Sequence, residues 1–552
     1  MIVSQTAYAQ QPVVLSHRWE SDPALNIDWY PPEIPAFPFA VDVQRIVSPH
    51  WQASVAEARK VTFSDAKKQV TNRAEAFSAC LDRLRDAAEA NPQARRAILS
   101  AALALAEGKA DVEALWQTVE AESVLAPLVE PALITSGSNQ ALSVWRERIA
   151  VANRNTSQLL IAIEGIGLVG DTSDRPLLLS ILSSGRMNLP TKLAAARALG
   201  ELLDQGQEDI AAELHGSGTP LCSLLAASVL RNHRGSAAAT KLLVEIASGD
   251  EAVSQAEAYR SLSDHAPEVA LEMAPTMLGS ADPTLRELAV AALNQSEEID
   301  DLRLQGTALA DENVRIRRQV RENLQAKSHN NEFRAVIEEL ILQMLDGDAA
   351  AGIEQAILLA DAIQDDRHQE RLVSLLSHPD DPVSIRAAWS LKTQSLSENL
   401  LVEIHQRCQR ATANYIASTR QSQTEEYRVS FLIESLGENR YEPAREMLLK
   451  FVPKHAPLPT LTRVSAVYAL GRIYEGQKDE PLAQQLMARA ADNNELDPED
   501  EQVRYAASIA VGRIGVTKHV ERLQSVEKEA ATTIALAAKW GYEHLMALGE
   551  GD

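Results

Sequence analysis

An apolar residue, in most places a leucine, recurs at nearly constant spacing in the middle of the chain, and this period restricts the fold more than any other feature. Five leucines mark it, at spacings of 31, 32, 31 and 31 residues: Leu199, Leu230, Leu262, Leu293 and Leu324. A period of about 20 to 50 residues is typical of chains built from stacked structural repeats. The series continues irregularly, through Ile363, Leu391, Leu436, Leu470 and Val511. We therefore expect insertions in the later repeats.

Each of these residues lies near the end of a segment with the apolar pattern of an amphipathic helix. In residues 503–515 the apolar side chains fall at i, i+3, i+4, i+7, i+8 and i+11, which is one face of a helix. Second, more aliphatic segments lie between the first ones, at 239–247, 268–278, 333–345 and 370–376. Two helices in one such period, joined by short turns, form an antiparallel pair.

Aspartate–proline pairs mark several helix starts: Asp282-Pro283, Asp381-Pro382 and Asp497-Pro498. The Asp side chain accepts hydrogen bonds from the free N–H groups of a first turn, and Pro has no N–H to leave unpaired there. We expect these pairs to open several of the second helices. Each helix pair covers the apolar face of the next, so the array should be continuous.

The composition agrees with a helical array. Hydrophobic residues make up 45% of the chain but aromatic residues only 4%. A β-sandwich is therefore disfavoured, since it would need more β-branched and aromatic residues, and a wholly disordered chain is excluded. The predicted fold class is all-α: an α-solenoid of antiparallel helix pairs with an extended N-terminal strap.

The motif V-R-x-A-A-x-x-A-[LV]-G-R-I-G, at residues 503–515 and 463–473, resembles the second helix of HEAT-like repeats, especially the short bilin-lyase type. The likeness covers about residues 151–525 and is diffuse outside these two segments. It implies an armadillo-type superhelix that acts as a scaffold or binds peptides, and it does not by itself imply an enzyme. The alternative that it raises is a lyase acting on a protein-bound chromophore or cofactor.

Three segments are predicted along the chain. Residues 1–51 are rich in Pro and Trp, which excludes helix interior and indicates an extended strap with its rings in pockets of a helical surface. The alternative is a segment that docks onto a partner. Residues 52–150 form a helical region continuous with the array, including a long helix over 64–90. Residues 151–552 form the HEAT-like solenoid.

The formal charge of −24 restricts the partners. It repels phosphate backbones, so nucleic acid is not expected as a partner, and it favours a basic protein or peptide. The chain has no run of about 18 apolar residues, so no membrane span is expected. If Ala7-Tyr8-Ala9 is the remnant of a signal-peptidase site, the protein is periplasmic or extracytoplasmic; otherwise it is cytoplasmic.

Basic residues share one repeat position, directly after the first residue of the apolar stripe: Arg286, Arg317, Arg463, Arg504 and Lys192. Aligned in a solenoid, they form either a cationic ladder that binds acidic groups or one packing contact or salt bridge per repeat. Trp389 and Tyr505 stand out because aromatic residues are rare, and they either contact a partner or fill the core. The candidate binding residues are Arg317, Trp389, Arg463, Arg504 and Tyr505.

Sequence motifs give no indication of a cofactor, a metal or a catalytic residue. The acidic run 492–501 lacks the Gly and one of the ligands that a helix–loop–helix calcium site requires. His405 and Cys408 form a single pair without a second pair to complete a metal site. The G-x-G-x-x-G match at 165–170 continues a helical pattern and is interpreted as a helix C-cap.

The sequence leaves three hypotheses for the function. They are a non-catalytic scaffold, a lyase of the bilin-lyase type, and a DNA alkylpurine glycosylase as in some HEAT-like proteins. The last needs a basic concave face and is disfavoured by the negative charge.

Overall fold

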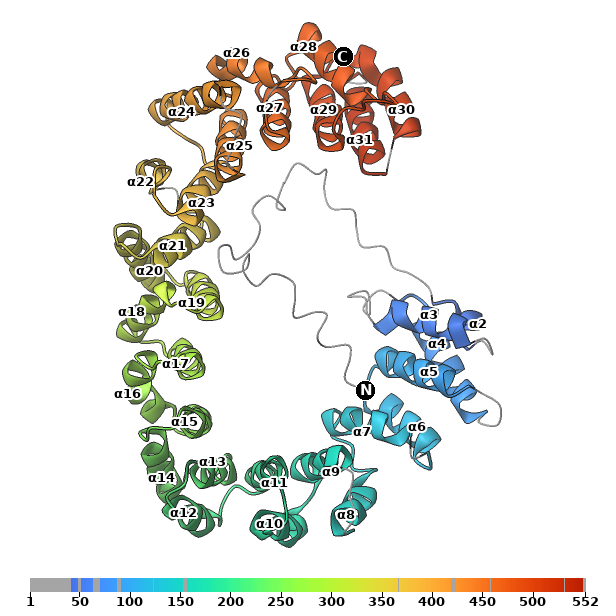
Figure 1. Cartoon of the computed structure of the whole chain (residues 1–552), viewed down its shortest axis with the longest axis vertical. Coiled ribbons are helices and arrows are strands. Elements are labelled where there is room, and N and C mark those ends of the chain that lie inside the picture. Colours follow the sequence, from blue (N-terminus) through green and yellow to red (C-terminus); the bar gives the residue numbers. More distant parts are fainter. Residues whose placement is uncertain are drawn as a thin grey trace. The chain divides into compact units, whose positions relative to one another are not determined.

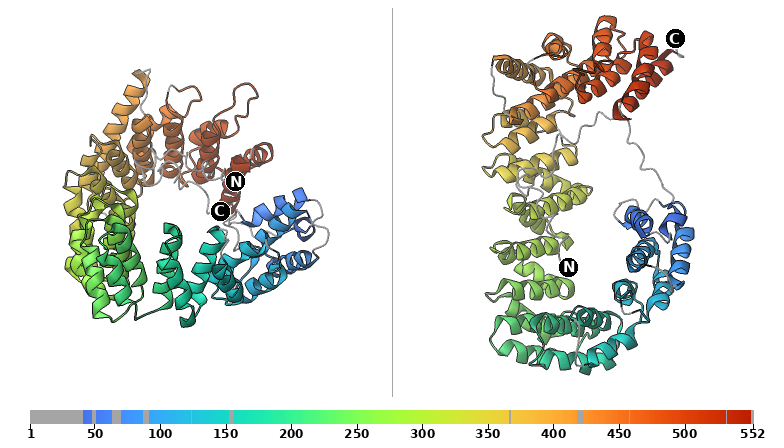
Figure 2. Two further views of the ribbon diagram at one scale, coloured as in Figure 1. Left: turned by 60° about the horizontal axis from the view of Figure 1, so that its bottom comes forward. Right: turned by 45° about the vertical axis from the view of Figure 1, so that its right-hand side comes forward.

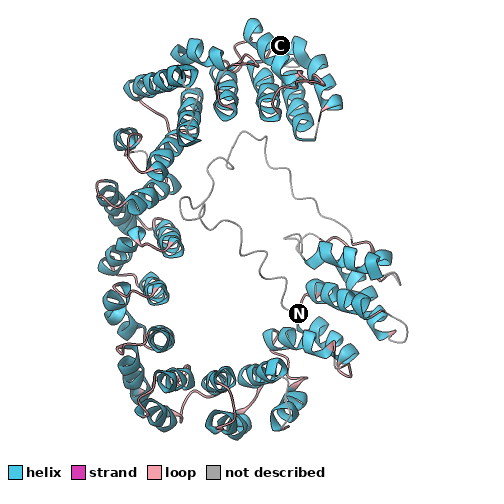
Figure 3. Ribbon diagram, in the orientation of Figure 1, coloured by secondary structure: helices cyan, strands magenta, loops and turns pink. Residues whose placement is uncertain are grey.

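The computed structural model describes residues 41–47, 51–62, 70–86, 91–122, 124–151, 156–365, 367–417, 423–456, 458–530 and 532–549. Helices are the regular elements of these ranges, and Val70 is an isolated bridge residue (Figure 3). The prediction of an all-α chain is confirmed. Among the helices of these ranges, none combines the length and the apolar character needed to cross a bilayer.

The described helices fall into two units, divided inside α17 (Pro283–Gln295). The N-terminal unit contains α2 (Val43–Ile46), α3 (Trp51–Thr62), α4 (Arg73–Arg85), α5 (Pro92–Leu105), α6 (Lys109–Val119), α7 (Ala126–Thr135), α8 (Leu142–Ala150), α9 (Thr156–Val169), η3 (Thr172–Asp174), α10 (Arg175–Ser183), α11 (Leu189–Leu202), α12 (Glu208–Gly216), α13 (Pro220–Val229), α14 (Ala237–Ala247), α15 (Ala252–His265) and α16 (Pro267–Leu278). The C-terminal unit contains α18 (Ile299–Thr307), η4 (Ala308–Ala310), α19 (Val314–Lys327), α20 (Asn331–Leu345), α21 (Ala350–Ala362), α22 (Gln369–Leu375), α23 (Asp381–Leu391), α24 (Glu398–Ala417), α25 (Gln423–Glu438), η5 (Glu442–Ala444), α26 (Arg445–Leu448), η6 (Leu449–Phe451), α27 (Thr460–Ile473), α28 (Glu480–Ala490), α29 (Glu501–Ile514), η7 (Thr517–His519), α30 (Val520–Glu529) and α31 (Thr532–Gly549).

Within each unit the helices pair and stack in two layers (Figures 1 and 2). In the C-terminal unit α23, α25, α27, α29 and α31 pack against one another in one layer, and α24, α26, α28 and α30 each pack against the next helix of that layer. In the N-terminal unit α9, α11, α13 and α15 pack in the same way, with α10, α12 and α14 beside them. The predicted α-solenoid of stacked helix pairs is therefore confirmed.

The predicted second helices are present, as α14, α16, α20 and α22. The prediction that Asp-Pro pairs open them is wrong. Pro283 begins α17, Pro382 lies in the first turn of α23, and Asp497-Pro498 precedes α29. These three helices contain the recurring leucine, or its apolar equivalent, and we call helices of this kind stripe helices. The Asp-Pro pairs therefore lie where the chain passes from a second helix into the next stripe helix.

Two predicted boundaries near the N-terminus change. Most of the predicted strap, residues 1–40 and 48–50, lies outside the described residues, but Val43–Ile46 form the single helical turn α2, capped by Asp42. Of the predicted helix over 64–90, residues 64–69 and 87–90 lie outside the described residues, and in the described part the helix begins at Arg73, after Asn72. The side chain of Asn72 accepts from Val41 N at 2.8 Å and donates to Val41 O at 2.9 Å. The division into 1–51, 52–150 and 151–552 stays a prediction.

A glycine directly after the last stripe residue lets neighbouring helices approach closely. It occurs in five stripe helices: Gly167, Gly200, Gly437, Gly471 and Gly512. A Cβ atom built on Gly437 would lie 2.6 Å from the Cα of Ala469, and one on Gly471 would lie 2.8 Å from the Cα of Ala510. Because interiors are close-packed, backbone at this distance leaves no room for a side chain.

The glycines of the G-x-G-x-x-G match serve the same packing. Gly165 and Gly167 lie inside α9 and do not cap it, which corrects the C-cap interpretation for these two residues. A Cβ on Gly165 would lie 2.5 Å from the ring of Trp145, which is fully buried.

Candidate interaction surface

The basic repeat position predicted from the sequence has one geometry in the structure. Arg317 donates from Nη1 to the carbonyl oxygens of Asp311 at 2.7 Å and Glu312 at 3.1 Å, in the loop that precedes its own helix. Arg286 binds the corresponding loop carbonyls before α17. Both guanidinium groups are buried and bind atoms of the array itself. This geometry agrees with the second alternative above, one packing contact per repeat.

The two later members of the series bind longer loops. Arg463 donates from Nε to Phe451 O at 3.2 Å and forms a two-pronged ion pair with Glu499 at 2.9 and 3.0 Å. Arg504 donates from Nε to Ala490 O at 3.2 Å. These side chains are only 5% exposed. A partner-binding role for Arg317, Arg463 and Arg504 stays a prediction, and their geometry explains the stability of the array without it.

The two aromatic candidates lie apart from each other. Tyr505 is buried in α29. Trp389 is half-buried in α23, and its ring lies 5.9 Å from the guanidinium of Arg386, which pairs with Glu354 at 3.1 Å. The structure therefore does not bring the five predicted binding residues together into one site.

One cavity lies on the layer of α24, α26 and α28. It measures about 720 Å³ and has both apolar and basic walls, including Ile416, Lys454 and Arg489. Two of its cations already have acidic partners: Lys454 pairs with Asp492 at 3.0 Å, and Arg489 pairs with Glu499 at 3.1 Å. Its walls adjoin residues 418–422 and 457, which lie outside the described ranges, so the cavity carries no functional argument.

A second cavity, of about 320 Å³, lies on the layer of α23, α25, α27 and α29. We call it the polar groove and define it by the residues Lys392, Glu434, Glu438, Tyr468, Arg472 and Arg513. Thr393, which is exposed, lines the polar groove and also a neighbouring cavity of about 370 Å³ that contains Asp361 and Asp365. Polar groups thus continue across consecutive repeats.

Repeat geometry places these side chains in a row. Glu438, Arg472 and Arg513 each follow the packing glycine of their helix, so they occupy one position in three consecutive repeats. Glu434 and Tyr468 lie four residues earlier on α25 and α27, on the same helix face. Because the glycine contacts hold the three helices close together, the row is a property of the fold.

Glu438 is the electrostatic centre of the polar groove. Arg472 binds both of its oxygens, at 2.7 and 3.1 Å, and the hydroxyl of Tyr468 donates to it as well. Burial raises the pKa of the Glu438 carboxyl, but the bonds from Arg472 and Tyr468 outweigh burial, and the pKa lies below its ordinary value. Glu438 is therefore ionised at neutral pH and is not a proton donor.

Glu434 and Lys392 extend the row toward α23. Glu434 accepts a hydrogen bond from Ser465 Oγ at 2.8 Å, and its carboxylate lies 4.0 Å from Lys392 Nζ. The neighbouring Asp361 is partly buried. Burial raises its pKa, and Lys392 and Ser390 oppose that rise. The described residues include no group of three His, Cys, Asp or Glu side chains placed to hold a metal ion.

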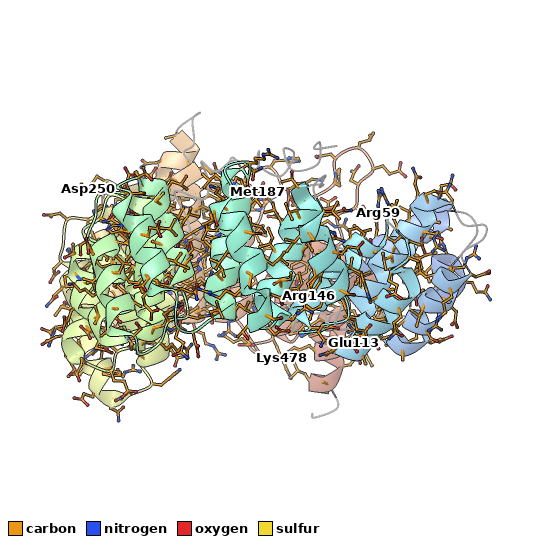
Figure 4. All side chains as sticks on the ribbon, turned by 90° about the horizontal axis from the view of Figure 1, so that it is seen from below. Arg59, Glu113, Arg146, Met187, Asp250 and Lys478 are labelled. Carbon is orange, nitrogen blue, oxygen red and sulfur yellow. The ribbon has the colours of Figure 1, made fainter. Side chains whose placement is uncertain are left out.

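Charged side chains also lie elsewhere on the helices, and Figure 4 labels several of them, among them Glu113, Arg146 and Asp250. Arg146, labelled there, joins α8 to the loop after α9 through Asp174 at 2.7 Å and Asp171 at 3.0 Å. Such pairs are common on a surface and contribute little individually. The polar groove differs because three of its charged residues occupy one repeat position beside a cavity.

Sequence reasoning did not single out the residues of the polar groove, although the signal was present. Arg472 and Arg513 are the arginines of the G-R-I segment in the HEAT-like motif. A polar residue that repeats directly after a packing glycine lies at the edge of a tight helix contact, where it remains accessible.

Comparison with known proteins gives structural likeness only. The chain matches no family model and no curated protein. Among solved structures it is similar to Kap121p bound to Pho4p, at 10% identity and a TM-score of 0.45, covering 92% of this chain and 53% of that one. It is also similar to Kap95p with RanGDP, at 14% identity and a TM-score of 0.49, covering 92% and 71%. A third is the karyopherin Kap121p bound to the SUMO protease Ulp1p, at 10% identity and a TM-score of 0.47, covering 92% and 56%. The chain spans about half the length of the Kap121p chains it matches.

Proposed function

We propose that the protein is a non-catalytic scaffold of HEAT-like repeats that binds a polypeptide segment along the polar groove. One observation carries this proposal. Glu438, Arg472 and Arg513 repeat at one position in three consecutive helices of a layer, beside a cavity of about 320 Å³. A surface with the periodicity of the repeats suits a ligand that is itself periodic.

The spacing agrees with an extended chain. Packed helices lie about 8 to 10 Å apart, and an extended polypeptide advances about 3.3 Å per residue. One repeat therefore corresponds to about three residues of ligand. A bound segment would meet a groove residue at every third position, with charge of both signs and the ring of Tyr468 available for contact.

The partner that this surface favours carries both charges. The formal charge of −24 attracts a protein of net positive charge at long range, while the acidic and basic side chains of the groove select the segment that binds. The lyase alternative would require an acid–base group that is free to exchange a proton with a ligand. The oxygens of Glu438 are already bound by Arg472 and Tyr468, so Glu438 does not favour this alternative.

Site-specific photo-cross-linking tests the proposal in cells that produce the protein. A benzoylphenylalanine at Thr393, an exposed residue of the groove wall, should form a discrete adduct with one polypeptide. The matched control is Gln343, an exposed residue of α20 in the other layer, which should form no adduct. Adducts of equal yield at both positions, or at neither, would overturn the proposal.

A further inference from the structure

Arg513 differs from Arg472, the arginine at the same repeat position, in having no hydrogen-bond acceptor in the described part of the chain, although its charge acts on the carboxylate of Glu438 across the polar groove. Among the described residues, no oxygen accepts a hydrogen bond from its guanidinium group, and its Nη1 atom is buried without a partner. Arg472, at the same position one repeat earlier, binds Glu438 with two bonds and Glu475 at 3.0 Å. A buried N–H group without an acceptor is rare in proteins.

Two aromatic rings hold this guanidinium in place. Its Cζ atom lies 5.0 Å from the ring centre of Tyr468 and 6.0 Å from that of Trp540 in α31. Cation–π contacts stabilise the charge over the ring faces without using the N–H donors. The planar set of donors therefore remains free to bind an anion.

The surrounding backbone fixes the same geometry. A Cβ atom on Gly512 would lie 2.7 Å from the Cα of Gly541, so α29 and α31 are in close contact directly beside Arg513 and Trp540. The carbonyl oxygen of Arg513 also accepts from Gly476 N at 2.8 Å. Arg513 is thus preorganised by both neighbouring repeats, which lowers the entropy cost of binding a ligand.

We infer that Arg513 is the point at which the polar groove recognises a carboxylate of the bound polypeptide, either an Asp or Glu side chain or a C-terminal carboxyl group. This inference rests on the proposed function. A planar carboxylate matches the paired donors of a guanidinium. A phosphate dianion fits less well, because the groove also contains the carboxylates of Glu434 and Glu438, which repel a second negative charge.

The test uses the smallest ligands that carry the chemistry. Deuterated full-length protein with ¹⁵N-labelled arginine is titrated with N-acetylglutamate amide, N-acetylglutamine amide and N-acetylphosphoserine amide. The Nε–H signal of Arg513 is followed and is assigned by its absence in Arg513→Lys. We expect a saturable shift with the glutamate compound, with an affinity at least about tenfold higher than for the glutamine compound. The shift should persist in the control Arg303→Gln, an exposed arginine of α18.

Three results would overturn the inference: equal affinity for the glutamate and glutamine compounds, tighter binding of the phosphoserine compound, or no response of the Arg513 signal. The binding is measured on the wild-type protein, so the inference does not depend on the folding of Arg513→Lys. If Arg513→Lys is unfolded, Trp540→Phe serves as the second variant, and it should weaken binding of the glutamate compound. A response to the glutamate compound without a cross-link at Thr393 would refute the proposed function alone. A cross-link without a response would refute the inference alone.

Discussion

The repeats that end at Leu199 through Leu324 and those that end at Leu436 through Val511 solve the same stacking problem in different ways. The first group has a nearly constant period, but after Leu199 the residue behind each leucine is polar: Arg231, Ser263, Asn294 and Gln325. The second group is spaced irregularly, but each member is followed by a packing glycine. The spacing of the recurring apolar residues depends on the length of the connections between helices. The glycine that follows them indicates how closely neighbouring helices approach.

The two groups also use their shared arginine differently. In the regular group Arg317 donates its hydrogen bonds to loop carbonyls of its own repeat. In the irregular group Arg463 pairs with Glu499, a residue of the following repeat. At this repeat position, Arg463 therefore forms an ionic link between repeats, whereas Arg317 and Arg504 bind the loops before their own helices. This difference predicts unequal responses to mutation and to pH.

The largest effect is expected from breaking that link. Arg463→Met leaves Glu499 buried without its main partner and should destabilise the C-terminal unit by about 3 kcal/mol or more. Arg317→Met removes charge-assisted bonds to carbonyls and should cost about 1 to 3 kcal/mol. Hydrogen exchange of the amides of α27 and α19 measures each effect locally. Equal losses at the two sites would contradict the distinction between the groups.

A smaller effect is expected at the position behind the stripe. Gly471→Ala forces a Cβ atom to within 2.8 Å of the Cα of Ala510 and should cost about 1 to 3 kcal/mol through overpacking. The matched change Gln325→Ala produces the same residue at the equivalent position, where the side chain is exposed, and should stay within about 0.5 kcal/mol. Chemical denaturation, monitored by hydrogen exchange, measures the free energy of unfolding of both variants. If Gly471→Ala leaves this free energy unchanged, the two helices can move apart without cost, and the prediction is wrong.

The smallest effect is expected from acid. Burial raises the pKa of Glu499, but hydrogen bonds from Arg463 and Asp500 N outweigh it, so its pKa lies below the ordinary value of 4.5. Its contribution to stability is therefore complete above that ordinary value and is lost as the pH falls through the lower folded-state pKa. Glu438 behaves in the same way.

In the regular group, Arg286 and Arg317 bind carbonyls that do not titrate. Exchange protection in α27 should therefore fall on acidification more than protection in α19. Glu499→Gln should reduce the difference, and identical pH profiles in the wild-type protein would argue against the ionic link.

Much of the fold could be predicted because it follows from periodicity. The leucine spacing and the helical apolar pattern sufficed to predict stacked pairs, and the second helices were predicted to within a few residues. The Asp-Pro pairs were assigned to the wrong helix of each pair, because a capping signal shows that a helix starts but not which face it buries. The start of α4 follows Asn72, which bonds Val41, a contact distant in sequence.

The candidate site was less accessible to prediction. The arginine series was recognised, and its alignment is real, but sequence alone could not decide whether the guanidinium groups face the loops or the solvent. The polar groove depends on which side of each packing glycine remains open. Arg472 and Arg513 are identical in motif and position, but Arg472 donates hydrogen bonds to Glu438 and Glu475, whereas Arg513 lies over the rings of Tyr468 and Trp540.

The arginine contacts have a mechanical consequence. Where Arg317 closes a loop of its own repeat, its hydrogen bonds add no resistance between repeats to a force applied to the ends of the chain. Where Arg463 reaches Glu499, two repeats are tied, and they should yield together at a higher force. An array of this kind would be a spring with soft and stiff segments, and the stiff one carries the polar groove.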